Sequence, residues 1–517
     1  MANERILWAD DEIDLLKPHI IFLEQKGYIV STANNGRDAI DMVKENYFDI
    51  VFLDENMPGL SGLQVLPEIK TIDPTLPVIM ITKSEEESIM EDAIGSKISD
   101  YLIKPVNPNQ ILLSVKKNLD EKRLVSEKTT SDYRQEFREI SMQLGDRMNH
   151  GEWSTFYKKL VRWSMELERS TDEGMTQIFE TQKQEANEQF SKFIKNNYIN
   201  WLKGSDGPIM SHTLVKNKVV PILKESGDKT VFMVVIDNLR FDQWKVIAPK
   251  LKEHFRVDDE EIFYSILPTA THYARNALFA GLMPSEIARI HPNLWKNEED
   301  EGGKNMHEDE LMGAQLKRLG FDIKWSYNKI TQLQQGRKLS DQFSNLMTNK
   351  LNVIVYNFVD MLSHARTEME VIKELADDEP AYRSLTDSWF EHSPLLEILK
   401  KVAENNCRLI ITTDHGTVRV DNPVKVIGDR NTNTNLRYKA GKNLNYNPKE
   451  VFEIKNPADG FLPKSNISTS YIFAQNRDFF VYPNNYNHFV NFYSNTFQHG
   501  GISLEEILIP FIALQAK

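Results

Sequence analysis

The sequence predicts an α/β protein built from three parts: a doubly wound five-stranded parallel sheet, a central helical bundle and a larger C-terminal α/β domain. The chain has 517 residues, which is too long for one ordinary hydrophobic core. Short apolar runs alternate with amphipathic stretches at its start. A long stretch with little glycine or proline then separates them from a second set of apolar runs.

The first part covers residues 1–121. Its apolar runs predict five strands, with the sequences RILWA, YIVSTA, DIVFLD, LPVIMIT and SDYLIKP. Amphipathic segments typical of helices lie between them. Such an alternation of strands and helices is typical of a parallel sheet covered by helices on both faces.

The second part covers residues 122–205, where charges are dense and aromatic residues recur at helical spacing. The stretch KGSDGP then marks a boundary, and the third part covers residues 206–517. Three runs in it are apolar and end in aspartate: VFMVVID, NVIVYNFVD and RLIITTD. Continuous apolar runs are typical of central strands that are covered on both faces.

The composition excludes several classes of protein. With 40% hydrophobic and 26% charged residues and no long apolar run, we expect a globular, cytoplasmic protein without a membrane span. The start of the chain shows no export signal, and the single cysteine fits a reducing compartment. A net charge of -13 and the absence of a helix-turn-helix pattern argue against direct binding to promoter DNA.

Polar residues follow the predicted strands of the first part. Asp10 and Asp11 follow the first strand, Asp54 ends the third, Thr82 ends the fourth, and Lys104 follows the fifth. Because the carboxyl ends of parallel strands meet at one edge of a sheet, we expect these side chains to converge. Crowded carboxylates favour a hard divalent cation, so the sequence predicts a Mg²⁺ site formed by the three aspartates.

This arrangement makes Asp54 a phosphate acceptor. Lys104 would contact a phosphate oxygen, the Thr82 hydroxyl would move toward the new anion, and Tyr101 would report that movement. Residues 1–121 resemble the flavodoxin-like receiver domains of response regulators. The resemblance implies phosphorylation of Asp54 by a sensor histidine kinase and homodimer formation through the face near Tyr101.

The third part contains a second set of metal-ligand residues after its apolar runs and near its end. Aspartate and histidine together favour Zn²⁺, with Mn²⁺ as the alternative, and six ligands suffice for two ions. The spacing of Asp360 and His364 places both on one face of a first helical turn. The candidate ligands are Asp237, Asp360, His364, Asp414, His415 and His499.

The segment ILPTATHYARNALFAGL supplies a nucleophile. Thr271 would stand at the start of its amphipathic helix, where the helix dipole and a neighbouring metal favour the ionised hydroxyl. Thr269 is the less favoured alternative. Arg240, Arg275 and Asn276 are candidate contacts to phosphate oxygens, although surface salt bridges explain them equally well.

About residues 210–517 resemble the alkaline phosphatase superfamily, most closely its PglZ branch. The resemblance rests on the order of an aspartate after the first strand, a threonine opening the next helix, D-x-x-x-H, D-H-G and H-G-G-x-S. It implies that Asp360, His364 and His499 hold one metal, that Asp237, Asp414 and His415 hold the other, and that Thr271 bridges them.

The order of receiver, helical connector and PglZ-like domain resembles the PorX-type regulators of type IX secretion. That resemblance implies an output through a sigma factor or secretion components. We expect a phosphodiesterase that acts on a nucleotide or oligonucleotide through a phosphothreonine. The alternatives are a phosphomonoesterase and a catalytically silent scaffold that binds its partners when phosphorylated.

Overall fold

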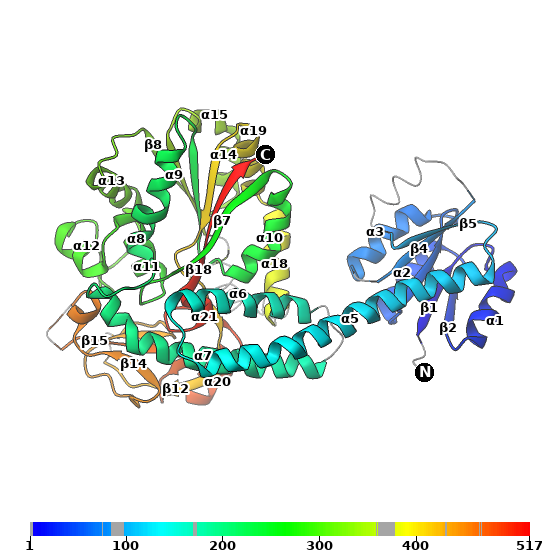
Figure 1. Cartoon of the computed structure of the whole chain (residues 1–517), viewed down its shortest axis with the longest axis horizontal. Helices are drawn as coiled ribbons and strands as arrows, with labels where there is room; N and C mark the ends of the chain where they lie inside the picture. Colours follow the sequence, from blue (N-terminus) through cyan, green and yellow to red (C-terminus); the bar gives the residue numbers. More distant parts are fainter. Residues whose placement is uncertain are drawn as a thin grey trace. The chain divides into compact units, whose positions relative to one another are not determined.

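The computed structural model describes residues 4–74, 76–83, 98–168, 173–357, 359, 378–429, 432–464, 466 and 468–517, without the side chains of 120–128, 130 and 173. The described residues divide into two compact units (Figure 1). The first extends to Asp132, and the second begins at Tyr133.

The first unit contains a five-stranded parallel sheet in the order β2-β1-β3-β4-β5, which confirms the predicted flavodoxin-like arrangement. Alternate residues of β1 face opposite sides: Leu7 packs into one core and Trp8 into the other. The strands are β1 (Arg5–Ala9), β2 (Ile29–Ala33), β3 (Ile50–Asp54), β4 (Val78–Thr82) and β5 (Asp100–Ile103). The helices here are η1 (Ile13–Leu16), α1 (Lys17–Gln25), α2 (Gly36–Glu45), α3 (Gly62–Ile72) and the start of α5 (Pro108–Gly145).

The expected helical segment consists of the end of α5, α6 (His150–Leu167) and α7 (Glu173–Leu202). Asn149 caps α6, because its side chain accepts hydrogen bonds from the amides of Gly151 and Glu152. The aromatic residues at helical spacing are buried, and they share one continuous core with the C-terminal strands. The described part of this helical segment from Tyr133 onward therefore packs as one unit with the C-terminal domain.

The main sheet of the second unit has six strands in the order β7-β18-β10-β6-β9-β8. The strands β10, β6, β9 and β8 are parallel, while β18 and β7 pair antiparallel at the other side. Figure 1 shows α8, α9, α11 and α13 on one side of these strands and α10, α18 and α19 on the other. The strands are β6 (Val231–Ile236), β7 (Phe255–Tyr264), β8 (Trp325–Ile330), β9 (Leu351–Tyr356), β10 (Arg408–Thr412) and β18 (Leu508–Ala516).

The helices around this sheet are mostly short. They are α8 (Ser211–Leu214), η2 (Val215–Val219), α9 (Val220–Glu225), α10 (Phe241–Lys252), α11 (Thr271–Ala280), α12 (Pro284–Ile290), α13 (Glu308–Arg318), α14 (Leu333–Asp341), α15 (Phe343–Leu346), α18 (Glu379–Glu391), α19 (Pro394–Glu404) and α21 (Leu504–Ile507). Among the helices that the structure describes, none is both long and apolar enough to span a bilayer.

The residues between β10 and β18 in the sequence form three small sheets in the described part of the chain. Their pairings are β11 with β17, β12 with β16, and β13-β15-β14. The elements are β11 (Val418–Arg419), β12 (Asn422–Lys425), β13 (Tyr438–Gly441), β14 (Val451–Ile454), η3 (Pro457–Gly460), β15 (Ser470–Ala474), β16 (Asp478–Val481), α20 (Tyr486–Tyr493) and β17 (Phe497–Gln498).

Candidate active site

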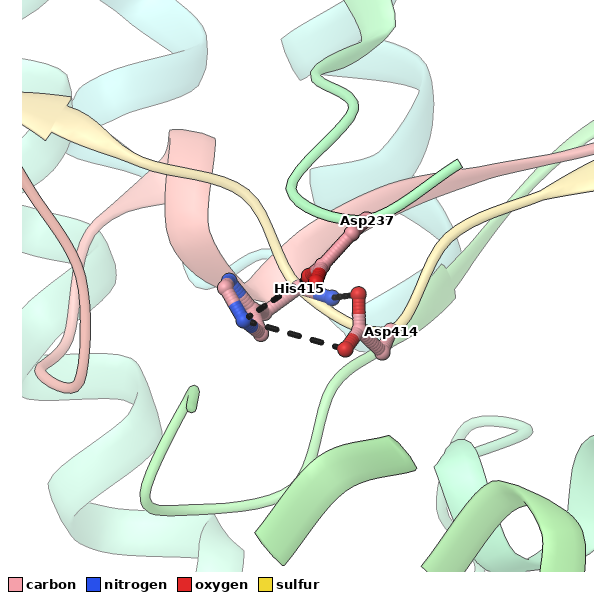
Figure 2. Close-up of side chains that lie close together, drawn as sticks. All are labelled: Asp237, Asp414 and His415. Carbon is pink, nitrogen blue, oxygen red and sulfur yellow. Dashed lines mark hydrogen bonds and ion pairs between the residues drawn. The ribbon is translucent and has the colours of Figure 1, made fainter. Parts of the chain in front are cut away.

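Three of the predicted ligands lie together at the carboxyl edge of the main sheet. Asp237 follows β6, and Asp414 and His415 follow the neighbouring parallel strand β10, so both turns open on the same edge. One ligand atom from each residue lies within 4.8 Å of the others, and all three side chains are buried. Figure 2 shows them pointing toward one another.

The Thr271 hydroxyl lies against this cluster. Thr271 is the first residue of α11, and its Oγ1 is 3.0 Å from His415 Nε2 and 3.3 Å from Asp237 Oδ1. The alternative, Thr269, is held by the backbone: its hydroxyl donates to the Gly501 carbonyl at 2.9 Å and accepts from the Gly500 amide at 3.0 Å. Of the two hydroxyls, the geometry therefore favours Thr271 as the nucleophile.

His499 comes from the distant end of the domain and joins the same site. Its ring stacks on that of His415, with centroids 4.3 Å apart. The Nδ1 of His499 is 3.2 Å from the Thr269 carbonyl, and the Nδ1 of His415 is 3.1 Å from the Gly416 carbonyl. Since a carbonyl only accepts, these contacts favour the tautomer with the proton on Nδ1, in which Nε2 is the atom able to ligate a metal.

The environment of the two carboxylates fits a divalent cation. Burial raises the pKa of Asp237 and of Asp414 because it disfavours the charged carboxylate, although Arg275 acts in the opposite direction on both. Asp414 Oδ2 is buried and has no hydrogen-bond partner in the described part of the chain. A cation held by Asp237, Asp414 and His415 would satisfy that oxygen and offset the crowded charge. Asp360 and His364, the other predicted ligands, lie outside the described residues.

Arg275 contacts the cluster through Asp237. Its Nη1 donates to Asp237 Oδ2 at 2.8 Å, which leaves Asp237 Oδ1 facing Thr271. Its Nε donates to Glu308 at 2.6 Å, and Glu308 also accepts from Lys329 Nζ at 2.9 Å. Because Arg275 is buried and pairs with Asp237, we assign it the role of orienting the Asp237 carboxylate.

Two other predicted substrate contacts have structural partners. The Arg240 side chain binds Asp242, with Nε 2.8 Å from Oδ1. Asn276 donates to the backbone carbonyls of His272 at 2.9 Å and of Lys304 at 3.1 Å. These contacts give both residues a part in holding the fold.

Sequence reasoning missed Glu308 and Asn305. Glu308 lies in the polar run NMHEDE, which is typical of a solvated helix start. Its side chain is nevertheless buried and accepts a hydrogen bond from Arg275. Asn305 donates to the Thr271 carbonyl at 3.0 Å and so holds the start of α11. No local pattern distinguishes these residues from exposed ones.

The N-terminal unit holds the second group of acids. One carboxylate oxygen each from Asp10, Asp11 and Asp54 lies within 4.8 Å of the others. Lys104 Nζ is 2.8 Å from Asp10 Oδ2 and 2.8 Å from Asp54 Oδ1. Burial raises the pKa of Asp54 although Lys104 acts in the opposite direction. Three close carboxylates with one lysine fit an additional divalent cation.

The remaining predicted switch residues lie on neighbouring strands of this unit. Thr82 ends β4, and its hydroxyl donates to the carboxylate of Glu55, the residue after Asp54. Tyr101 lies on β5, is half-buried and packs against the core under α2 and α3. The Thr82 hydroxyl is therefore bound to the residue next to the predicted acceptor.

Comparison with known proteins identifies all three parts of the chain. The model of the BREX system PglZ alkaline phosphatase-like domain matches residues 214–514, more than half of the chain. The chain belongs to the PglZ family. The PorX response regulator linker domain matches residues 123–202 of this PglZ protein, and the response regulator receiver domain matches residues 6–116. The resemblance to PorX-type regulators is thereby confirmed.

Curated relatives match the receiver of this PglZ protein. The alginate biosynthesis transcriptional regulatory protein AlgB of Pseudomonas syringae pv. tomato is 35% identical over 120 residues, which are 23% of this chain and 27% of that protein. ZraR of Klebsiella oxytoca is 36% identical over 126 residues, 24% of this chain and 28% of that protein. ResD of Bacillus subtilis is 34% identical over 116 residues, 22% of this chain and 48% of that protein. The chain thus spans between a quarter and a half of each of these relatives.

Two solved receiver structures are similar to the N-terminal part of the PglZ protein. A receiver domain from Clostridium thermocellum shares 32% identity and covers 23% of this chain and 98% of its own, with a TM-score of 0.23. A CheY-like receiver domain from Methanospirillum hungatei shares 27% identity and covers 23% and 96%, also with a TM-score of 0.23.

Proposed function

We propose that this protein is a response regulator whose output domain is a two-zinc phosphodiesterase with Thr271 as nucleophile. The observation that carries this proposal is the position of the Thr271 hydroxyl, within 3.3 Å of both Asp237 and His415 at the start of α11. A hydroxyl among buried metal-ligand groups is the arrangement that a covalent phosphoryl transfer needs. The match to an alkaline phosphatase-like family supports the same reaction class.

Each residue of the site has a distinct role in this proposal. Asp237, Asp414 and His415 would hold one Zn²⁺, and His499 with Asp360 and His364 would hold the second, with Mn²⁺ as an alternative. Bound cations supply charge stabilisation and lower the pKa of the hydroxyl. Thr271 Oγ1 attacks phosphorus, the bond to the leaving oxygen breaks, and the resulting phosphothreonine is hydrolysed by water. Arg275 keeps Asp237 oriented throughout.

The substrate that we propose is a nucleotide or oligonucleotide phosphodiester. The zinc-loaded protein is incubated with bis-p-nitrophenyl phosphate and, separately, with mono-p-nitrophenyl phosphate. We expect faster release of p-nitrophenol from the diester, and the activity should disappear when a chelator removes the metal. Turnover of the monoester alone would instead identify a phosphomonoesterase.

For the receiver we propose a Mg²⁺ ion at Asp10, Asp11 and Asp54, with phosphorylation of Asp54 by a sensor histidine kinase. Lys104, which already contacts Asp54, would bind the phosphoryl group, and Thr82 with Tyr101 would signal its arrival. A phosphorylation-dependent homodimer in the cytoplasm, with a sigma factor or type IX secretion components as output, completes the proposal. It rests on the match to the receiver and PorX linker families.

A further inference from the structure

Three polar side chains form a stripe along one face of α7. Lys183, Asn187 and Ser191 follow one another at intervals of one helical turn, so they share a face. Asn187 and Ser191 are buried, and the Lys183 side chain is 13% exposed. Burying polar groups costs free energy unless they are hydrogen-bonded, so each member of this polar stripe needs a partner.

Every member of the polar stripe contacts residues 502–505, which directly follow the His499 turn. Asn187 accepts a hydrogen bond from the Leu504 amide at 2.8 Å and donates to Glu505 at 3.1 Å. Lys183 forms an ion pair with Glu505 at 3.2 Å. Ser191 Oγ donates to Asn476 Oδ1 at 2.8 Å and lies 3.5 Å from the Ile502 carbonyl. Lys183 and Asn187 therefore hold this short segment, and Ser191 lies beside it.

The two residues between His499 and this segment are held by other contacts. The Gly500 amide donates to Thr269 at 3.0 Å, and the Gly501 amide donates to Glu506 at 2.9 Å. His499 thus lies between Thr269, in the loop before α11, and the 502–505 segment that contacts α7. A shift of residues 502–505 would move its imidazole relative to His415, on which it stacks.

A neighbouring residue connects α7 to α5. Gln182 accepts a hydrogen bond from Tyr133 at 2.9 Å and donates to Ser141 at 2.9 Å and to the Phe137 carbonyl at 3.2 Å. All three partners lie on α5, whose first residues belong to the receiver unit. Gln182 and Lys183 are adjacent, so one position of α7 faces α5 and the next faces the segment that follows His499.

We propose that the polar stripe of α7 positions His499 for metal binding, and that Gln182 makes this position depend on α5. Lys183, Asn187 and Ser191 are positioning residues, because they act through the 502–505 segment and touch no ligand themselves. The inference rests on the proposed role of His499 as a ligand of one of the two zinc ions. Residues that orient metal ligands are worth roughly 10- to 100-fold in metal affinity when they are removed.

The experiment compares Asn187→Ala with Asn197→Ala in the full-length protein. Asn197 is the matched control, because it lies on the same helix and its side chain donates to the Phe193 carbonyl of that helix. Zinc affinity and stoichiometry are measured by competition with a chromophoric chelator. Hydrogen exchange is measured on a peptide covering residues 499–507.

For Asn187→Ala we expect one ion to bind about 10- to 100-fold more weakly while the other is retained. Exchange at the Leu504 amide should accelerate, and Asn197→Ala should behave as the wild type. Unchanged binding of both ions, or equal weakening of both, would overturn the proposal. If Asn187→Ala does not fold, Asn187→Leu, which fills the same space but removes the acceptor of the Leu504 amide, is measured with the same expectations.

The wild type separates this inference from the proposed function. A wild type that binds fewer than two zinc ions overturns the ligand assignment on which the inference rests. A wild type that binds two ions but hydrolyses no diester overturns the phosphodiesterase while the metal-affinity result still decides the role of the stripe.

The link to α5 is tested with acetyl phosphate and Mg²⁺ as the probe. Phosphorylation should change exchange in the 499–507 peptide of the wild type, and Gln182→Ala should remove that change. Identical exchange with and without acetyl phosphate in the wild type would refute the role of Gln182.

Discussion

Two threonines that are close in sequence have different surroundings in the structure. Thr271 presents its hydroxyl to His415 and Asp237, whereas Thr269 uses its hydroxyl to bind the backbone on both sides of Gly500. Backbone contacts thus occupy the Thr269 hydroxyl, whereas the Thr271 hydroxyl faces the candidate metal ligands. The two roles make opposite predictions for mutation.

We expect Thr271→Ala to lower diester turnover by about 10³-fold or more while zinc stoichiometry stays the same, because only the attacking oxygen is lost. Initial rates and metal content measure the two effects. Thr269→Ala should instead lower the free energy of unfolding by about 1–3 kcal/mol, because it leaves a buried amide without its acceptor. Full activity of Thr271→Ala would contradict the assignment.

The buried ion pair between Glu308 and Arg275 should stabilise the fold. Glu308→Gln removes the charge that pairs with Arg275, so we expect a loss of about 3–5 kcal/mol in unfolding free energy. Chemical denaturation measures it. The control is Glu310→Gln on the same helix, where an exposed pair with His307 should change stability by less than about 1 kcal/mol. Equal effects in the two variants would argue against the buried pair.

At the scale of elements, a group of buried ion pairs joins α10, α18 and α7. Asp242 on α10 binds Arg240 and Arg383, and Glu379 at the start of α18 binds Lys183. Burial alone would raise the pKa of Asp242, but Arg240 and Arg383 outweigh it and lower that pKa to about 2. Burial alone would raise the pKa of Glu379 too, but Lys183 and Arg240 outweigh it and lower that pKa.

This ion-pair group predicts sensitivity to acid. A carboxylate with a depressed pKa stabilises the fold above its unfolded value of about 3.9, and this stabilisation disappears as the pH falls toward 2. For Asp242 the loss amounts to about 2–3 kcal/mol. Urea denaturation at several pH values should therefore show a shallower decline between about pH 4 and 2 for Asp242→Asn than for the wild type. Parallel declines would rule out this contribution.

Much of the fold could be predicted at the element scale. Continuous apolar runs identified β6, β9 and β10, and the aspartates after β6 and β10 were two of the six predicted metal ligands, which the structure brings together with His415. The antiparallel strands β7 and β18 and the small sheets between β11 and β17 could not be predicted, since their pairings join residues far apart in sequence. Glu308 and Lys183 were missed for a related reason: they belong to polar runs, and only tertiary packing buries them.

Across the whole molecule, the described residues hold two groups of acids that fit divalent cations, and all of these acids except Asp11 are buried. The receiver group contains a lysine and a threonine near Asp54, while the PglZ group contains a threonine and stacked histidines. In the functions that we propose, the first group would store a phosphoryl group and the second would transfer one.

Acetyl phosphate with Mg²⁺ should add one phosphoryl group per chain, and Asp54→Asn should prevent it. Asp41→Asn, an exposed substitution on α2, is the control and should label as the wild type does. Intact-mass spectrometry measures labelling, and size-exclusion chromatography of the labelled protein tests the proposed dimer. Labelling of Asp54→Asn to the wild-type level would exclude Asp54 as the acceptor.

The position of β18 has a consequence for biosynthesis. Residues 508–516 insert between β7 and β10, so the main sheet stays open until the ribosome has delivered them. Until then the nascent chain presents two unpaired strand edges and the apolar residues that β18 later covers. Pairing over some 250 residues of sequence is also slow to form. We therefore expect this half of the protein to depend on molecular chaperones in the interval between synthesis of β10 and insertion of β18.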